Sequence, residues 1–308
     1  MRTAPMQEPA TPTGSPGEAW TISRLLNWTR DHLASRAIDE PRLAAEVLLA
    51  HAASIRRIDL YTRFDRVPEE AVVSRFRESV RRAARNEPIA YLVGEKEFFS
   101  LPFFVTPDVL IPRPDTETLV ECVLDHFQRN PSEAPTLLDV GTGSGCIAIS
   151  ILRNLPSAAA VASDVSEAAL AVARRNAERH GLSERIRFVQ ADGFDLPASD
   201  VPEGRFDALV CNPPYIAADA VEALPAAVRD YEPHLALTDR GDGLSFYSRI
   251  AAAAPTFLTP TGLIAVEIAD DAAEVVLPLM AATGKLEHQA TLRDRGSGRQ
   301  RVMIFRLG

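Results

Sequence analysis

The feature that most constrains the fold is a glycine-rich turn between a strand-like apolar run and a helix-like run. The strand-like run is Thr136 to Val140, and the helix-like run is Cys146 to Leu155. The residues between them, which we predict to bind a ligand, are Gly141, Thr142, Gly143, Ser144 and Gly145. Glycines let a backbone turn tightly and approach a ligand, and the following helix presents unpaired N–H groups. The sequence therefore predicts a nucleotide-binding strand–turn–helix unit.

The spacing of the glycines narrows the choice of ligand. It is GxGxG with Cys146 after the third glycine, so it misses the GxGxxG pattern of dinucleotide sites. No Lys-Ser or Lys-Thr pair follows the turn, as it does in phosphate-gripping loops. A pyrophosphate group is therefore not the favoured ligand.

Acidic residues follow the next two predicted strands. Ala159 to Ser163 ends at Asp164, about twenty residues past the glycines, where a carboxylate can bind ribose hydroxyls in the Rossmann arrangement. Ile186 to Ala191 is the third strand of this series. The residues after it that we include in the predicted cofactor site are Asp192, Gly193 and Phe194. Taken singly, each aspartate can instead be the N-cap of the next helix.

The tetrapeptide Asn212, Pro213, Pro214 and Tyr215 follows the apolar run Phe206 to Cys211. The two prolines fix φ, remove two backbone donors and restrict the residues before them, so the loop leaves the strand in one stiff path. The Asn212 side-chain oxygen and the Pro213 carbonyl can together accept both hydrogens of one NH₂ group, with Tyr215 packed on its plane. The alternative is a strand-ending turn with an aromatic lid.

Periodicity along the chain predicts two kinds of structure. Helical spacing appears at Ile22 to Ala34, Pro41 to Ile55 and Pro68 to Asn86, with Pro41 and Pro68 as first-turn prolines. The runs Glu97 to Phe104 and Val109 to Ile111, split by prolines, predict an irregular connecting hairpin. From Asp115 onward strands alternate with helices, which predicts a mostly parallel sheet covered on both faces, with its fifth strand at Leu263 to Ile268.

Composition fits a soluble protein with one large and one smaller domain. The 308 residues are 46% hydrophobic and 24% charged, and no segment reaches membrane-spanning length without charges. Residues 1–18 are rich in Pro, Thr and Gly without an apolar core, so we expect a disordered tail and no secretory signal. Three scattered cysteines without CxxC spacing indicate a reducing cytoplasm and argue against structural zinc, and His234 is expected to be structural or solvated.

The net charge of −9 and pI of about 5.3 bear on the partner. An acidic chain must concentrate its basic residues to bind nucleic acid. The candidate basic cluster is Arg75, Arg77, Arg81, Arg82 and Arg85. On a helix these side chains spread among Glu78 and Glu87, so a solvated face is the favoured interpretation. A protein substrate fits this charge more easily than a nucleic acid does.

Several motifs together resemble one family. They are the segment Leu110 to Glu117 with the sequence LIPRPDTE, the glycine turn, Asp164, Asn212 to Tyr215, Tyr231-Glu232-Pro233 and Gly241-Asp242-Gly243-Leu244. The chain from about Trp20 to its end resembles the protein-(glutamine-N5) methyltransferases of peptide chain release factors, the PrmC/HemK family. The IPRPDTE stretch discriminates, because many methyltransferases share the glycine turn and Asp164, and the adenine-N6 enzymes have a motif like Asn212 to Tyr215. Ala269 and Ala273 replace the family's usual Gly and Gln after the fifth strand.

The resemblance implies an α/β fold: a Rossmann-like class I methyltransferase domain with a mostly parallel seven-stranded sheet, a small N-terminal helical domain and a connecting β-hairpin. The runs near Leu286 to Leu292 and Arg301 to Arg306 fit the antiparallel pair that closes such a sheet. The implied divisions are a tail at 1–18, a helical substrate-recognition domain at 19–92, the hairpin at 93–112 and the methyltransferase domain at 113–308.

The implied cofactor is S-adenosyl-L-methionine, and the implied acceptor is the glutamine of the Gly-Gly-Gln motif of release factors. Asn212, Pro213 and Tyr215 are then the expected catalytic residues, Asn212 to Tyr215 contact the substrate, and Asn212 also borders the cofactor. The sulfonium methyl group is already electrophilic, so positioning matters more than a base. We expect a cytoplasmic monomer with a protein substrate and no metal, no membrane and no direct nucleic-acid partner.

Three alternatives stay open at this stage. An adenine-N6 nucleic-acid methyltransferase uses a similar tetrapeptide, but needs a basic groove and a base-flipping pocket. A glutamine methyltransferase of a ribosomal protein shares the chemistry, and a catalytically silent nucleotide-binding protein shares the fold.

The insertion Ile216 to Gly241 is long for a strand-to-helix connection, so it is expected to flank the substrate entrance or to be a structural surface loop.

Overall fold

The computed structural model describes residues 19–203 and 205–308. Contacts within the chain divide it into two compact units, the first ending at Val93 and the second beginning at Gly94. Each unit is described by itself. The tail predicted at residues 1–18 lies outside the described residues.

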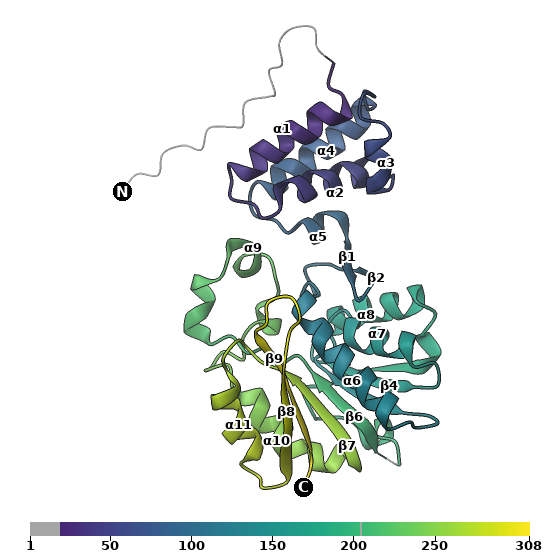
Figure 1. Ribbon diagram of the computed structural model, residues 1–308, viewed down its shortest axis with the longest axis vertical. Coiled ribbons are helices and arrows are strands. Elements are labelled where there is room, and N and C mark those ends of the chain that lie inside the picture. Colours follow the sequence, from purple (N-terminus) through teal and green to yellow (C-terminus); the bar gives the residue numbers. More distant parts are fainter. Residues whose placement is uncertain (1–18, 204) are drawn as a thin grey trace. The chain divides into compact units, whose positions relative to one another are not determined.

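The first unit is helical (Figure 1). Its helices are α1 (Ile22–Ala34), α2 (Pro41–Ala53), α3 (Arg57–Tyr61), α4 (Glu70–Ala83) and α5 (Ile89–Val93). Thr21 caps α1 by accepting a hydrogen bond from Arg24 N, and Pro41 occupies the first turn of α2 as predicted. The predicted place of Pro68 is wrong, because α4 begins after the extended residue Glu69. Proline fixes only φ, and an extended position satisfies that value as well as a helical one does.

The apolar faces of these helices form one core that includes Leu33, Leu48, Leu60 and Phe76. The arginines of α4 are largely engaged locally. Arg75 donates a hydrogen bond to the carbonyl of Ala52 on α2. Two further arginines form ion pairs, Arg81 with Glu78 and Arg82 with Glu87. These contacts support the solvated-face interpretation over a concentrated basic patch.

The second unit opens with an antiparallel hairpin of β1 (Glu95–Phe98) and β2 (Leu101–Phe104). Its turn residues Phe99 and Ser100 have φ of 50° and 58°, as a tight two-residue hairpin turn requires. The predicted connecting hairpin lies within its first run, and Val109 to Ile111, the second run assigned to it, forms no strand. The backbone there bonds a side chain instead of a strand, since Ile111 N donates to Glu232.

A seven-stranded sheet organises the described residues of the second unit, in the order β5-β4-β3-β6-β7-β9-β8. The strands are β3 (Thr136–Val140), β4 (Ala159–Asp164), β5 (Ile186–Gln190), β6 (Phe206–Cys211), β7 (Leu258–Glu267), β8 (Leu286–Arg293) and β9 (Gln300–Leu307). The strands from β5 to β7 are parallel, and β9 and β8 run antiparallel, so the predicted fold class is confirmed. β7 begins earlier than predicted, because Leu258 pairs with Phe206 before a register shift.

Helices cover both faces of this sheet (Figure 1). Successive residues of a strand point to opposite faces, so Leu137 packs with α6 and α7 while Leu138 packs with α10 and α11. The longer helices are α6 (Glu117–Arg129), α7 (Cys146–Asn154), α8 (Glu167–Arg179), α10 (Ser245–Phe257) and α11 (Ala273–Ala281). The short helical segments are η1 (Pro114–Thr116), η2 (Ser183–Arg185), η3 (Ala198–Asp200), η4 (Ala218–Ala223), α9 (Ala226–Arg229) and η5 (His234–Ala236).

The two departures from the family pattern lie after β7. Ala269 accepts the backbone N–H of Ala272, and Ala273 begins α11 and packs against the core on that face. A regular helix therefore starts here with small apolar residues. Among the described residues, no helix combines the length and apolarity that a membrane crossing requires.

The chain order places a ligand site at one edge of the sheet. From β3 the chain proceeds to β4 and β5 on one side, and then returns to β6 on the other side of β3. In open α/β sheets, ligands bind outside the carboxyl ends of the strands at such a switch point. The turn after β3 is held there by Asn176 of α8, whose amide donates to Ser144 O at 2.9 Å.

Asn176 also fixes the hairpin, because its amide both accepts from Phe104 N and donates to Phe104 O. Its side chain is fully buried. We expect Asn176→Ala to lower the free energy of unfolding of the second unit by about 1 to 3 kcal/mol, because it leaves buried backbone groups unpaired. Chemical denaturation measures this loss. Asn154→Ala, which removes one bond to Ser150 O within a single helix, is the control, and equal losses in the two variants would contradict the clamp.

Candidate active site

The glycine turn after β3 is open on the side where a ligand can approach. Gly141 and Gly143 have positive φ, and a Cβ on either would meet no atom within 4 Å. Gly145 has a different reason to be glycine, because its Cβ would lie 3.0 Å from Ile149 and 3.3 Å from the Cβ of Ala173. It therefore allows α7 to pack closely on α8. Gly141, Thr142, Gly143 and Ser144 line one pocket, whereas Gly145 lies behind it.

Asp164 lines the same pocket at the end of β4. Its Oδ2 accepts the N–H of Gly143 at 2.9 Å, and its Oδ1 accepts the N–H of Ser166 at 2.9 Å. Burial raises the pKa of Asp164, and these backbone hydrogen bonds oppose the rise. The helix-cap alternative is wrong, because Ser166 Oγ caps α8 by accepting from Ala169 N. The carboxylate keeps further lone pairs for hydroxyl donors.

Asp139 was not among the predicted site residues, yet its side chain supports the glycine turn through a hydrogen bond with Thr142. Its side chain is fully buried, and Oδ2 accepts the hydroxyl proton of Thr142 at 2.7 Å. Oδ1 has no hydrogen-bond partner among the residues that the structure describes, and burial raises the pKa of Asp139 to about 6. The signal was an acidic residue inside an otherwise apolar strand, two positions before the first glycine.

The residues after β5 contribute to the pocket in part. Asp192 and Gly193 line it, and the Asp192 carboxylate pairs with Arg249 at 2.9 Å. Phe194 lies outside the lining, and its ring contacts Phe257 at a centroid distance of 5.8 Å. The aromatic residue that does line the pocket is Phe246 of α10, which was not among the predicted site residues.

The segment after β6 brings Asn212, Pro213 and Pro214 into the pocket. The Asn212 amide donates from Nδ2 to the Thr116 hydroxyl at 3.3 Å, and no described residue donates to its Oδ1. The Asn212 Oδ1, one of the two oxygens predicted to accept from an NH₂ group, is therefore available as an acceptor. The pocket thus joins the glycine turn and Asp164 to the residues predicted to hold an acceptor.

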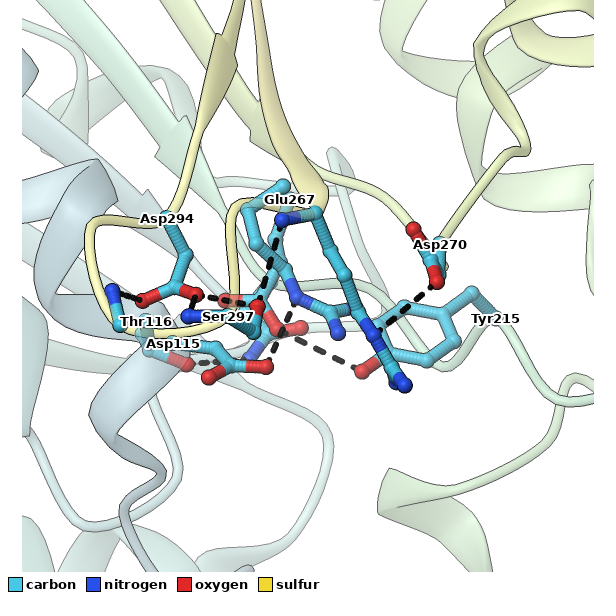
Figure 2. Close-up of polar contacts among 11 residues, drawn as sticks. Asp115, Thr116, Tyr215, Glu267, Asp270, Asp294 and Ser297 are labelled. Atoms are coloured by element: carbon cyan, nitrogen blue, oxygen red, sulfur yellow. Dashed lines mark hydrogen bonds and ion pairs between the residues drawn. The ribbon is translucent and has the colours of Figure 1, made fainter.

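Tyr215 lies outside the pocket lining and packs against the core on the α10 side. Its hydroxyl donates to Glu267 Oε1 at 3.4 Å (Figure 2). Burial, together with the charge of Glu267, raises the pKa of Tyr215 well above its usual range, so it stays protonated. Its backbone lies so close to Gly243 that a Cβ at position 243 would be 2.3 Å from the Tyr215 carbonyl oxygen.

A buried carboxylate connects two of the sequence motifs. Glu232 accepts the N–H of Ile111 at 3.2 Å and pairs with the guanidinium of Arg113, although its side chain is 2% exposed. This contact joins LIPRPDTE to Tyr231-Glu232-Pro233. Arg113 and Pro233 both line the pocket, so the two motifs form one of its walls.

The insertion from 216 to 241 also reaches the pocket. Pro233, Leu235 and Ala236 belong to its lining, and that the insertion flanks the substrate entrance stays a prediction. His234 serves the insertion itself, because its Nε2 lies 2.7 Å from the carbonyl of Arg229. Among the described residues, no group of three or more His, Cys, Asp or Glu side chains is placed to hold a metal ion.

Two family descriptions match the chain: PrmC N-terminal domain at residues 24–94 and Methyltransferase small domain at residues 115–231. Among solved structures, the catalytic domain of human METTL16 in complex with a MAT2A 3′UTR hairpin is 19% identical. It has a TM-score of 0.53, with 68% of this chain and 76% of that chain covered. This likeness shows the fold alone.

Curated relatives extend over most of the chain. The Release factor glutamine methyltransferase of Geobacter sulfurreducens is 43% identical over 87% of this chain and 90% of its own length. Proteins of the same name from Chlorobaculum tepidum and Rhodopirellula baltica are 44% and 40% identical. They cover 84% and 92% of this chain, and 89% and 95% of their own lengths. The chain therefore belongs to the release factor glutamine methyltransferase family.

Proposed function

We propose that this protein transfers the methyl group of S-adenosyl-L-methionine to the amide nitrogen, N5, of the glutamine in the Gly-Gly-Gln motif of peptide chain release factors. The observation that carries the proposal is a single pocket that combines the glycine turn and Asp164 with Asn212, Pro213 and Pro214. Curated relatives named Release factor glutamine methyltransferase support the choice of acceptor.

The residues at the end of β3 and β4 fit S-adenosyl-L-methionine. The open space over Gly141 and Gly143 admits a ligand close to the backbone, and the remaining lone pairs of Asp164 suit ribose hydroxyls. Asp192 and Gly193 border the same space. When bound, the cofactor supplies a methyl group on a sulfonium, which needs no activation by a base.

Asn212 and Pro213 are proposed to hold the acceptor. A glutamine amide nitrogen is a poor nucleophile because its lone pair is delocalised into the carbonyl. Acceptors placed on both of its N–H bonds stabilise the positive charge that develops during transfer. Asn212 Oδ1 and the Pro213 carbonyl are the proposed acceptors, and the half-buried, proline-rich backbone holds them with little reorganisation. Tyr215, whose ring packs outside the pocket lining, is proposed to contribute through its backbone, which continues the Pro213-Pro214 segment.

We propose a division of labour along the chain. Residues 19–92 recognise the protein substrate, residues 93–112 form the hairpin that connects the two domains, and residues 113–308 bind the cofactor and transfer the methyl group. A separate helical unit can bind a partner independently of the cofactor fold.

We further propose that the protein acts in the cytoplasm as a monomer and binds no nucleic acid directly. The net charge of −9 and the paired arginines of α4 support the last point.

The first prediction from the proposed function concerns cofactor affinity. Asp164→Ala should weaken binding of S-adenosyl-L-methionine by roughly 1 to 3 kcal/mol, because charged hydrogen bonds to the ribose are lost. Isothermal titration calorimetry measures the change. Glu167→Ala is the control, since it removes a half-exposed carboxylate that pairs with Arg174. Unchanged affinity in Asp164→Ala would remove this residue from the proposed cofactor site.

The second prediction concerns turnover. Asn212→Ala should lower kcat by about 10²-fold or more, as expected for loss of one preorganised transition-state partner, while cofactor affinity falls much less. Steady-state kinetics with calorimetry separates the two effects. Asn130→Ala changes an exposed asparagine at the end of α6 and should behave like the wild type. Equal kcat in Asn212→Ala would rule out the acceptor role.

The third prediction concerns the substrate. Incubation with labelled S-adenosyl-L-methionine should add one methyl group to a release factor, as measured by mass spectrometry. Changing the motif glutamine of that factor to alanine should abolish the labelling. Parallel reactions with ribosomal proteins and DNA are the controls, and preferential labelling of either, or of another residue, would overturn the assignment.

A further inference from the structure

The last three residues of LIPRPDTE each contact a different part of the second unit. The Asp115 carboxylate pairs with the guanidinium of Arg301 on β9, at 2.7 Å between Oδ2 and Nε. The Thr116 hydroxyl accepts a hydrogen bond from Nδ2 of Asn212, directly after β6, at 3.3 Å. Glu117 accepts a backbone N–H of the turn between β1 and β2 at 2.8 Å. Of these three motif residues, Thr116 is the one that lines the pocket.

The Thr116 side chain is not used in the usual way for its position. It stands at the N-cap of α6, where a threonine normally accepts a backbone N–H, but it makes no capping hydrogen bond. Its hydrogen bond goes to Asn212 instead, across 96 residues of sequence. Thr116 is 3% exposed, so bulk water has little access to replace this contact.

An asparagine amide needs a partner to hold its plane. The terminal torsion of an asparagine side chain has broad, shallow minima, so the amide can rotate when nothing binds it. The hydrogen bond from Asn212 Nδ2 to Thr116 restricts that rotation. Since Nδ2 faces Thr116, Oδ1 lies on the other branch of the amide, and no described residue donates to it.

The position of Thr116 depends in turn on Arg301. The Arg301 carbonyl accepts the N–H of Ile268 at 2.8 Å, which anchors it beside the end of β7. Its side chain is 10% exposed, and a guanidinium buried to this degree requires a charged partner. That partner is Asp115 (Figure 2), which precedes Thr116 in the single turn η1. The ion pair therefore ties this turn to the central sheet.

The turn between β8 and β9 offers a second arginine for comparison. Arg299 pairs with Asp270 at 3.3 Å, but its side chain is 60% exposed. An exposed ion pair contributes little, because water solvates both charges and screens their attraction. Arg299 and Arg301 thus carry the same charge at neighbouring places, and the buried pair is the one that leads to Thr116.

We propose that Thr116 is a positioning residue that fixes the plane of the Asn212 amide, and that the ion pair of Arg301 with Asp115 holds Thr116 in place for this task. The inference rests on the proposed function, because it assigns Asn212 Oδ1 to the substrate amide. It gives the discriminating segment of the sequence a role in methyl transfer. An Asn212 amide that rotates freely leaves the cofactor contacts intact, so its cost falls on kcat.

Three variants test the hydroxyl. Thr116→Val removes it and keeps the branched shape, so kcat should fall about tenfold while cofactor affinity is unchanged. Thr116→Ser keeps the hydroxyl and should stay within about twofold of the wild type. Thr118→Val is the control, since Thr118 is buried on the same helix and lies outside the pocket lining. Thr116→Val as fast as Thr118→Val, or Thr116→Ser as slow as Thr116→Val, would overturn the role of the hydroxyl.

A double-mutant cycle tests whether Arg301 acts through Thr116. Arg301→Gln should lower kcat about tenfold in the wild type, but by less than about twofold in Thr116→Val, where the contact is already lost. Arg299→Gln breaks the exposed ion pair of the same turn and should leave kcat unchanged in both backgrounds. Equal factors for Arg301→Gln in the two backgrounds would contradict the route through Thr116.

Thermal unfolding verifies that each variant is folded. If Arg301→Gln does not fold, Asp115→Asn takes its place in the cycle. This substitution breaks the same ion pair from its more exposed side, where the side chain is 37% exposed. The same loss of effect in the Thr116→Val background is expected, and equal factors in the two backgrounds would again contradict the proposal.

A readout that needs no turnover separates this inference from the proposed function. The side-chain NH₂ resonance of Asn212 is assigned by its loss in Asn212→Ala. Its chemical shift should change in Thr116→Val and Arg301→Gln, and stay as in the wild type in the two control variants. If it changes in this way but release factors are not methylated, the proposed function fails and the positioning stands. An unchanged resonance in Thr116→Val would overturn the positioning whatever the substrate.

Discussion

The site depends on the register of three parallel strands. Val140 of β3 lies opposite Ser163 of β4 on one side and Cys211 of β6 on the other. The next residue on β3 opens the glycine turn, on β4 it is Asp164, and on β6 it is Asn212. Because parallel strands end at a common edge, one row of the sheet delivers the ligand-facing turn, an acid and an amide to the same pocket. A slip of one residue would send these side chains to other faces.

Buried and half-buried acids hold this edge in shape. Asp164 fixes Gly143, Asp139 fixes Thr142, and Glu232 fixes the backbone at Ile111. A buried carboxylate costs free energy unless hydrogen bonds or cations compensate it. Here the compensation comes from backbone N–H groups, hydroxyls and Arg113, which are the groups that must be placed accurately for binding. The hydrogen bonds of these acids hold in place the loop segments that line the pocket.

Local patterns predicted the elements well where apolar periodicity was uninterrupted. The strand Thr136–Val140 and the helix Ile22–Ala34 have the predicted bounds. The errors lie where backbone geometry has more than one solution. Pro68 suits an extended position as well as a helical one, and the apolar run Val109 to Ile111 pairs with a side chain in place of a strand. Asp139 and Phe246 were not predicted, and Thr116 was named only as part of the LIPRPDTE segment, because burial and the contacts in the pocket depend on the folded chain.

The sequence by itself determined the fold class, the glycine turn and the residues at three strand ends, because strand alternation, turn chemistry and motif spacing are local properties. Only the tertiary structure decided which of these residues face one another. It placed Asn212 in the pocket and Tyr215 behind it, and it joined Asn212 to Thr116, which lies 96 residues earlier in the chain. The physical reason is that burial and hydrogen-bond direction depend on neighbours brought together by packing, and no local pattern records them.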